Sequence, residues 1–484
     1  MAKRVFRPYE PDRPLPLPPD LRQWLPADHL VYLLSDLVDH LDLSPITSVY
    51  DQGDGGGNPP YHPVMLTKPL FYAYAQGVVS SRAIAAKTYE DVAFRVLTAD
   101  QHPDFRTISD FRERHLPALL PLFQETVRLA GRLGLVKLEH VAQDGSKILA
   151  NASKHRAMSY ARMQQAEARL GHEIQALLEA AHQADAAEDV AYGPDRTGDE
   201  VPAALRGEAA RRERRLATIR AAKAVLEQEA REEAAAIRAA DAAERQRRAA
   251  AGEPKKPGRP PAPREVPKDQ AQRNFTDPDS RIMKNADQAF VQAYNGQLAV
   301  DASPRQRIVG CAVTNQAADA PHLAPMVEQV RAVTGGTPRE WSSDTGYFSA
   351  PNLRVLARAG IAAFIPPERQ PHSTQPLPAD VAQVLEAAGV GPPAAAAASE
   401  AGAPAEMRAK LSTDAGRAAY AKRKQTVEPV FGQLKERRGL RRFLLRGLAK
   451  VSGEWALWCL THNLTKLVRA LRTTPSLRQR LATA

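Results

Sequence analysis

The sequence predicts a mixed α/β domain that follows an all-helical segment and is interrupted by a long helical hairpin. Three observations support this fold class. Apolar residues recur with helical spacing through residues 1–132, and short segments of strand character lie on both sides of residues 159–270. The intervening segment is rich in Ala, Glu, Arg and Gln, which are strong helix formers. We therefore expect one α/β domain assembled from residues 133–158, 271–370 and 406–470.

The N-terminal segment reads as a set of amphipathic helices behind a proline-rich arm at residues 1–27. Helices are expected from His29 onward and at residues 67–76, 80–89 and 109–132, with Ser80 and Ser109 as N-caps. A helix-turn-helix that presents Arg106, Arg112 and Arg114 to DNA is one interpretation. A plain bundle of amphipathic helices explains the same pattern.

Residues 159–270 form the predicted insertion, with two long helices folded back on each other around a break at residues 192–202. Its end is basic and proline-rich, and its Gly-Arg-Pro core resembles a minor-groove AT-hook in which Arg259 would enter the groove. A basic linker is the alternative interpretation of this end.

Segments with strand character define the predicted α/β domain. A strand at 138–143 leads to Asp144, a β-hairpin pairs 293–300 with 307–314, and a strand at 340–343 leads to Asp344. Helices at 321–333 and 350–359 and a last strand at 361–365 complete a mixed sheet. Residues 371–405, rich in Ala and Pro, are expected to be a mobile excursion.

The charge of the chain is concentrated at its C-terminal end. The 484 residues carry a net charge of +11, and from Tyr420 onward there are 15 Lys and Arg against 3 Asp and Glu. This segment also contains many large apolar residues, so it should fold and display its charge, as expected of a polyanion binder. Two isolated cysteines exclude a disulfide framework or a zinc site, and there is neither a signal core nor a transmembrane run. We expect a cytoplasmic protein with no membrane partner.

Three acids stand out as candidate metal ligands. Asp144 and Asp344 each follow a predicted strand, and Glu428 lies within the basic C-terminal segment. If the two strands are neighbours, the aspartates converge at one sheet edge, where hard carboxylate ligands suit Mg²⁺ or Mn²⁺. Considered one at a time, each aspartate is also explained as a turn residue, and Glu428 is also explained as an ion-pair partner. Asp301 also follows a strand, but it lies in a hairpin turn.

The order of these three acids along the chain resembles that in the DDE transposases of bacterial insertion sequences. The C-terminal stretch is similar to their Y-R-E-K signature, with Tyr420, Arg423, Glu428 and Lys435 in that order. The gap from Arg423 to Glu428 is one residue longer than the common form, and Lys424 stands at the usual spacing. Residues 427–432 resemble the branch with an EPVFG box, and residues 103–112 resemble its helical N-terminal domain.

The resemblance implies a ribonuclease-H-like fold and DNA transposition through an Asp-Asp-Glu triad. Asp144, Asp344 and Glu428 would bind two Mg²⁺ or Mn²⁺ ions and catalyse cleavage and strand transfer at the ends of the element. The DNA would contact basic and aromatic side chains, namely Tyr420, Arg423, Lys424, Lys435, Arg437, Arg438 and Arg259. A homodimer on double-stranded DNA and association with the nucleoid are also implied. A catalytically inactive DNA-binding descendant is the alternative, and a nuclease that cuts without joining is a third possibility.

Pro429 directly follows Glu428, and a residue before proline is disfavoured in helical geometry. We therefore expect Glu428 at a helix start or kink rather than inside one straight helix over residues 420–435.

Overall fold

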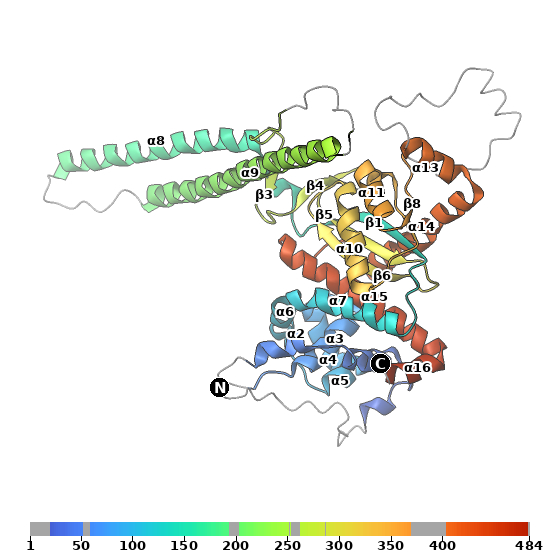
Figure 1. The fold of residues 1–484 in the computed structure, drawn as a ribbon. Coiled ribbons are helices and arrows are strands. Elements are labelled where there is room, and N and C mark those ends of the chain that lie inside the picture. The colour runs from blue at the N-terminus through green and yellow to red at the C-terminus, as the bar shows by residue number, and fades with distance from the viewer. Residues whose placement is uncertain are drawn as a thin grey trace, which may run out of the picture. The chain divides into compact units, whose positions relative to one another are not determined.

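The computed structural model describes residues 20–51, 59–192, 203–250, 252, 262–285, 287–368 and 403–482. The predicted arm up to residue 19, Arg259 and residues 371–402 lie outside the described residues. The chain divides into two compact units, one formed by Met1–Leu149 with Tyr294–Ala484 and the other by Ala150–Ala293. Figure 1 shows the elements of both units.

The first unit begins with helices, in line with the expected amphipathic pattern. They are α1 (Leu30–Asp39), α2 (Ser44–Thr47), α3 (Pro63–Ala75), α4 (Ser81–Glu90), α5 (Val92–Thr98), α6 (Phe105–Arg114) and α7 (Leu116–Arg132), with short 3₁₀ turns η1 (Leu21–Gln23) and η2 (Ser48–Tyr50). The single helix expected over 109–132 is wrong, since α6 ends at Arg114 and α7 begins at Leu116. Asp104, and not Ser109, caps α6, because its side chain accepts from the amides of Arg106 and Thr107.

The sheet of the first unit contains β1 (His140–Leu149), β5 (Phe290–Asp301), β6 (Arg307–Thr314), β7 (Glu340–Ser342) and β8 (Ala362–Phe364). Its order is β6-β5-β1-β7-β8. The β5–β6 pair is the predicted antiparallel hairpin, and β1, β7 and β8 pair in parallel. Crossovers between the parallel strands carry α10 (Leu323–Thr334) and α11 (Ala350–Arg358), as parallel pairing requires.

The strand before Asp344 ends as predicted, but the strand at Asp144 does not. β1 pairs with β7 only over His140–Ala142, and it then continues through Asp144 to Leu149. Asp144 is therefore inside β1, just beyond the last residue that pairs with β7. Asp344 lies two residues after the end of β7 and caps the 3₁₀ turn η5 (Thr345–Tyr347).

The C-terminal part of the first unit is helical: α13 (Ala403–Ser412), α14 (Asp414–Gly432), a π-helical turn η6 (Gln433–Arg437), α15 (Leu448–Thr473) and α16 (Pro475–Ala482). Trp455, Trp458 and Leu464 are among the buried residues of α15, which packs against β6, α7, α3 and α1. Because these contacts join the N-terminal helices to the sheet, both belong to one compact unit.

Of the two positions expected for Glu428, a helix start or a kink, the helix start is wrong. Helix α14 starts at Asp414 and runs through Glu428, with Pro429 inside it. Proline has no amide hydrogen, so the carbonyl of Gln425, four residues earlier, loses its helical partner. The side chain of Gln306 from the β5–β6 turn supplies a replacement, donating from Nε2 to that carbonyl at 2.6 Å. A tertiary contact thus compensates for the proline, and the helix changes to π geometry only at Gln433.

The second unit is built around the predicted helical hairpin. α8 (Tyr160–Tyr192) and α9 (Ala203–Ala250) share an apolar core that includes Met163, Leu170 and Ile219. Ion pairs cross between the helices, such as Arg212 with Glu173 at 2.8 Å. β2 (Ala157–Ser159) pairs with β3 (Gln272–Asn274), and β4 (Arg281–Lys284) pairs with the first residues of β5. No helix among the described residues has the length and apolarity needed to span a membrane.

Asp301, the competing metal-ligand candidate, has a structural role that yields a first prediction. It is 1% exposed and its carboxylate accepts from the amides of Lys137, Leu138 and Ser303 at 2.9–3.4 Å. Replacing Asp301 by Ala should destabilise the protein by about 3 kcal/mol, because buried amides lose a charged acceptor. Urea unfolding measures this, with the fully exposed Asp414→Ala as control, expected within about 0.5 kcal/mol of the parent. Equal effects of the two substitutions would refute the capping role.

Candidate active site

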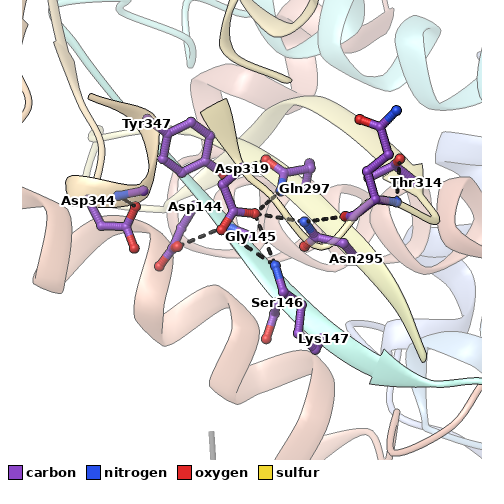
Figure 2. A network of polar contacts seen from close by, with 12 residues as sticks. Asp144, Gly145, Ser146, Lys147, Asn295, Gln297, Thr314, Asp319, Asp344 and Tyr347 are labelled. Carbon is purple, nitrogen blue, oxygen red and sulfur yellow. Dashed lines mark hydrogen bonds and ion pairs between the residues drawn. The ribbon is translucent and has the colours of Figure 1, made fainter. Parts of the chain in front are cut away.

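The two predicted aspartates lie at one end of the parallel strands. The register that aligns His140–Ala142 of β1 with Glu340–Ser342 of β7 places Asp144 and Asp344 at equal distances beyond the paired residues. Figure 2 shows both carboxylates on the same side of this sheet end. The convergence expected from neighbouring strands is therefore observed.

Arg423 connects this sheet end to helix α14. Its Nη1 donates to Oδ2 of Asp144 at 2.9 Å, and its Nη2 donates to Oε1 of Glu428 at 2.8 Å. The Arg423 side chain is 12% exposed, that of Asp144 is 18% exposed, and that of Glu428 is 45% exposed. One guanidinium thus bridges a strand carboxylate and a helix carboxylate, and it orients both.

A further carboxylate, Asp319, was missed by the sequence reasoning. It lies between β6 and α10, and it accepts from Lys147 Nζ at 3.1 Å, Asn295 Nδ2 at 2.7 Å and Gln297 Nε2 at 2.8 Å. Figure 2 shows the contacts converging on it. The only sequence signal was its place after a predicted strand, which Asp301 shares.

The network extends through buried amides and a phenol. Gln297 connects Asp319 to further residues, because its Oε1 accepts from Gln143 Nε2 at 3.3 Å and from the hydroxyl of Tyr347. Asn352 then donates to the carbonyls of Tyr347 and Ala320 at 2.8 and 2.9 Å. The segments that carry Asp319 and Asp344 are therefore fixed to each other and to β5.

Two glycines allow this close packing. A Cβ on Gly145 would lie 2.3 Å from Gln297 Nε2, 2.6 Å from Asp319 Oδ1 and 2.9 Å from Asn295 Oδ1. A Cβ on Gly346 would lie 3.1 Å from Asp344 Oδ1. Glycine at position 145 is thus a requirement of the polar network, in addition to being a common turn signal, while a side chain at position 346 would need only a small shift of Asp344.

Burial and neighbouring charges shift the pKa values of the groups in this site. Burial raises the pKa of Asp144 to about 7, and the charges of Asp344 and Asp319 add to this while Arg423 opposes it. Burial also raises the pKa of Asp344, with Asp319 adding to the effect. Burial alone would lower the pKa of the Arg423 guanidinium, but Asp144, Tyr420 and Glu428 raise it overall. Burial thus disfavours the charged form of both aspartates, and a cation bound between them would offset this cost.

The remaining residues of the signature lie around this cluster. Lys435 on η6 donates to the hydroxyl of Ser146, two residues beyond Asp144, and burial lowers the pKa of its ammonium. Tyr420 is half-buried, with the Arg423 guanidinium 5.9 Å from its ring centre. Lys424 and Arg437 are exposed to solvent.

Two predicted DNA-facing arginines lie in the interior instead. Arg438 is 8% exposed and donates to oxygens of Thr461 and Thr465 on α15. Arg112 is 7% exposed and donates to Tyr74, Val79 and Ser81. Both hold helices together, so we do not include them among proposed DNA contacts. Arg259 lies outside the described residues.

The donor set fits a hard divalent cation, although the side chains are not arranged around one. Within the described ranges, no three His, Cys, Asp or Glu side chains form a group that could hold a metal ion. The carboxylate oxygens of Asp144, Asp344 and Glu428 are the ligands that Mg²⁺ and Mn²⁺ prefer, and a cation would offset the cost of burying the charge of Asp144. The Arg423 guanidinium bridges two of the three, so a shift of its side chain would open the site.

Comparisons with known proteins assign the chain to the transposases, a class defined by the mobile elements that encode them. A family model described as a transposase domain (DUF772) matches residues 19–114, and one described as a transposase DDE domain matches residues 396–468. The chain belongs to the insertion-sequence DDE transposases. Searches of curated proteins and of solved structures gave no match.

The close packing at Gly145 gives a second prediction. Gly145→Ala should destabilise the protein by about 1–3 kcal/mol, because the added methyl group displaces the side chains around Asp319. Gly171→Ala in α8 is the matched control, since nothing lies within 4 Å of its Cβ position. The control should stabilise the helix by up to about 1 kcal/mol. Thermal unfolding that shows the same sign for both substitutions would contradict this packing.

Proposed function

We propose that this protein is an active DNA transposase. It binds the double-stranded ends of its own insertion sequence, cleaves a phosphodiester bond there and joins the resulting 3′ end to target DNA. The observation that carries the proposal is the Arg423 bridge, which brings Glu428 of α14 to Asp144 of β1 beside Asp344. These are the three acids that the Asp-Asp-Glu triad requires.

A ribonuclease-H-like catalytic domain is part of the proposal. Its support is the order β6-β5-β1-β7-β8, with an antiparallel hairpin on one side of β1 and parallel strands on the other. In this arrangement the central strand carries the first aspartate, its parallel neighbour leads to the second, and a C-terminal helix carries the glutamate.

Asp144, Asp344 and Glu428 would hold two Mg²⁺ or Mn²⁺ ions. Such ions supply activation of the attacking oxygen and stabilisation of the leaving oxygen in an in-line displacement. The protein's own groups do the rest. Asp319 and its donors fix the positions of Asp144 and Asp344, and Arg423 keeps the carboxylates together before the ions bind.

The DNA backbone would lie along the basic C-terminal segment. Exposed Lys424 and Arg437 are available to phosphates, and Lys435 lies next to the carboxylates through Ser146. Tyr420 and Arg423 are placed on the same helix as Glu428. We further propose that two copies of the chain act together on DNA, in the cytoplasm and associated with the nucleoid.

Cleavage of DNA that carries the element ends tests the proposal. Asp144→Asn, Asp344→Asn and Glu428→Gln should each lower Mg²⁺-dependent cleavage by about a thousandfold or more, because losing one metal-binding carboxylate removes several kcal/mol of charge stabilisation. DNA binding, measured by gel shift, should be largely retained. Glu436→Gln is the matched control, since Glu436 is exposed and pairs with Arg441, and its activity should stay within about twofold.

The alternatives give different results in the same assays. DNA binding by the parent protein without cleavage would indicate a catalytically inactive descendant. Cleavage without joined products would indicate a nuclease. Normal cleavage by any of the three acid variants would remove that residue from the triad.

A further inference from the structure

A second group of basic side chains in the first unit gathers around the β5–β6 turn and the C-terminal half of α15. We call it the basic cluster, and its members are Arg305, Arg307, Arg438, His462, Lys466 and Arg469. His462, Lys466, Arg469 and Thr473 follow one another at helical spacing on α15, so they share a face of that helix. Arg305 reaches the same face, donating to the hydroxyl of Thr473.

Most of this charge is buried and has no carboxylate partner. Arg307 is 2% exposed, and its Nε and Nη2 have no hydrogen-bond partner. Lys466 is 7% exposed, and its ammonium donates to the neutral Oε1 of Gln306 at 3.4 Å. The Arg438 guanidinium donates to hydroxyl and carbonyl oxygens of Thr461 and Thr465. Among the described side chains, no acid lies within ion-pair distance of these three residues.

The cluster is electrostatically strained. Burial lowers the pKa of Lys466 to about 8, and repulsion from Arg469 and Arg438 adds to the shift. Burial lowers the pKa of Arg307 to about 10, although Asp301 opposes the shift. Burial also lowers the pKa of Arg438 to about 10, so all three buried cations retain charge at neutral pH, and burying a charge without an ion-pair partner costs several kcal/mol. Such an arrangement reduces stability unless an anion offsets it.

Gln306 links the basic cluster to the helix that carries Glu428. Its carbonyl accepts from His462 Nε2 at 3.1 Å, and its side-chain amide donates to the carbonyl of Gln425 on α14. Gln306 adopts a left-handed backbone conformation with φ of 49°, which is unfavourable for this residue. This turn holds Arg305 and Arg307 close to the part of α14 that contains Gln425 and Pro429.

We propose that Arg305, Lys466 and Arg469 of the basic cluster bind a phosphate group of the DNA backbone, at a site separate from the carboxylates, while the buried Arg307 and Arg438 add positive charge without contacting it. The phosphate would contact exposed Arg469 and half-buried Arg305 directly. Its negative charge would also neutralise the more deeply buried Lys466. The phosphate chemistry follows from the cluster itself, while its assignment to DNA rests on the proposed function. Contact through Gln306 with α14 makes the same DNA duplex the natural source, since that helix also carries Lys424 and Glu428.

Substitution of Lys466 should separate stability from binding. Lys466→Met keeps the apolar stem and removes a crowded charge, so the melting temperature without ligand should rise. Its affinity for duplex DNA should fall about tenfold, as expected for one charged hydrogen bond. The slope of log affinity against log salt should decrease by about one. Lys450→Gln on the same helix is the charge-matched control, because Lys450 is exposed and pairs with Glu113.

Inorganic phosphate serves as a second probe that does not require DNA. At matched ionic strength with chloride, phosphate should raise the melting temperature of the parent protein and of Lys450→Gln. The increase should be reduced in Lys466→Met and in Arg469→Gln, and the exposed Arg469 provides a variant with little risk to folding.

The outcomes are distinct. Unchanged DNA affinity and unchanged phosphate stabilisation in both variants would overturn the site. A lost phosphate response with unchanged DNA affinity would overturn the assignment to DNA. If the parent protein cleaves no DNA but shows the phosphate response, the proposed function fails while the anion site stands.

Discussion

Coulomb repulsion among carboxylates at one end of the sheet is the constraint on which the site depends. The parallel register of β1 and β7 brings Asp144 and Asp344 together, and Asp319 joins them from the segment after β6. Three buried or half-buried acids cannot remain close and charged without cations. Lys147 supports Asp319, and Arg423 reaches across from α14 to Asp144. The apolar residues Val427, Val430 and Phe431 pack α14 against the rest of the unit, and Arg423 then brings Glu428 of the same helix to this sheet end.

The sequence predicted those parts of the fold that local pattern determines. Alternating and apolar segments located the β5–β6 hairpin and the strand before Asp344, and composition located the paired helices α8 and α9. It placed Asp144 and Asp344 at the ends of two strands, and the structure supplied the pairing of those strands. It misplaced the end of β1, because pairing with β5 extends that strand through Asp144, and pairing between distant segments leaves no local signal.

Tertiary contacts explain what the sequence could not predict. Pro429 indicated a helix start or a kink at Glu428. The helix instead begins at Asp414, and Gln306, far away in the chain, donates to the Gln425 carbonyl in place of the missing proline amide. Arg438 and Arg112 looked like surface charges, yet their partners are buried hydroxyls and carbonyls that no spacing rule connects. Asp319 resembles an ordinary loop residue until Lys147, Asn295 and Gln297 are seen around it. Residues whose partners are distant in sequence acquire their function only in the folded chain.

Mn²⁺ binding, measured by electron paramagnetic resonance on the purified protein, tests the proposed metal site most directly. We expect saturable binding to the parent protein and a large loss of affinity in Asp144→Asn, because Asp144 is the carboxylate common to the sheet end and the Arg423 bridge. Arg423→Gln should bind Mn²⁺ at least as tightly as the parent, since the competing guanidinium is gone. Equal Mn²⁺ affinity in the parent protein and in Asp144→Asn would contradict the assignment of this site as the metal-binding centre.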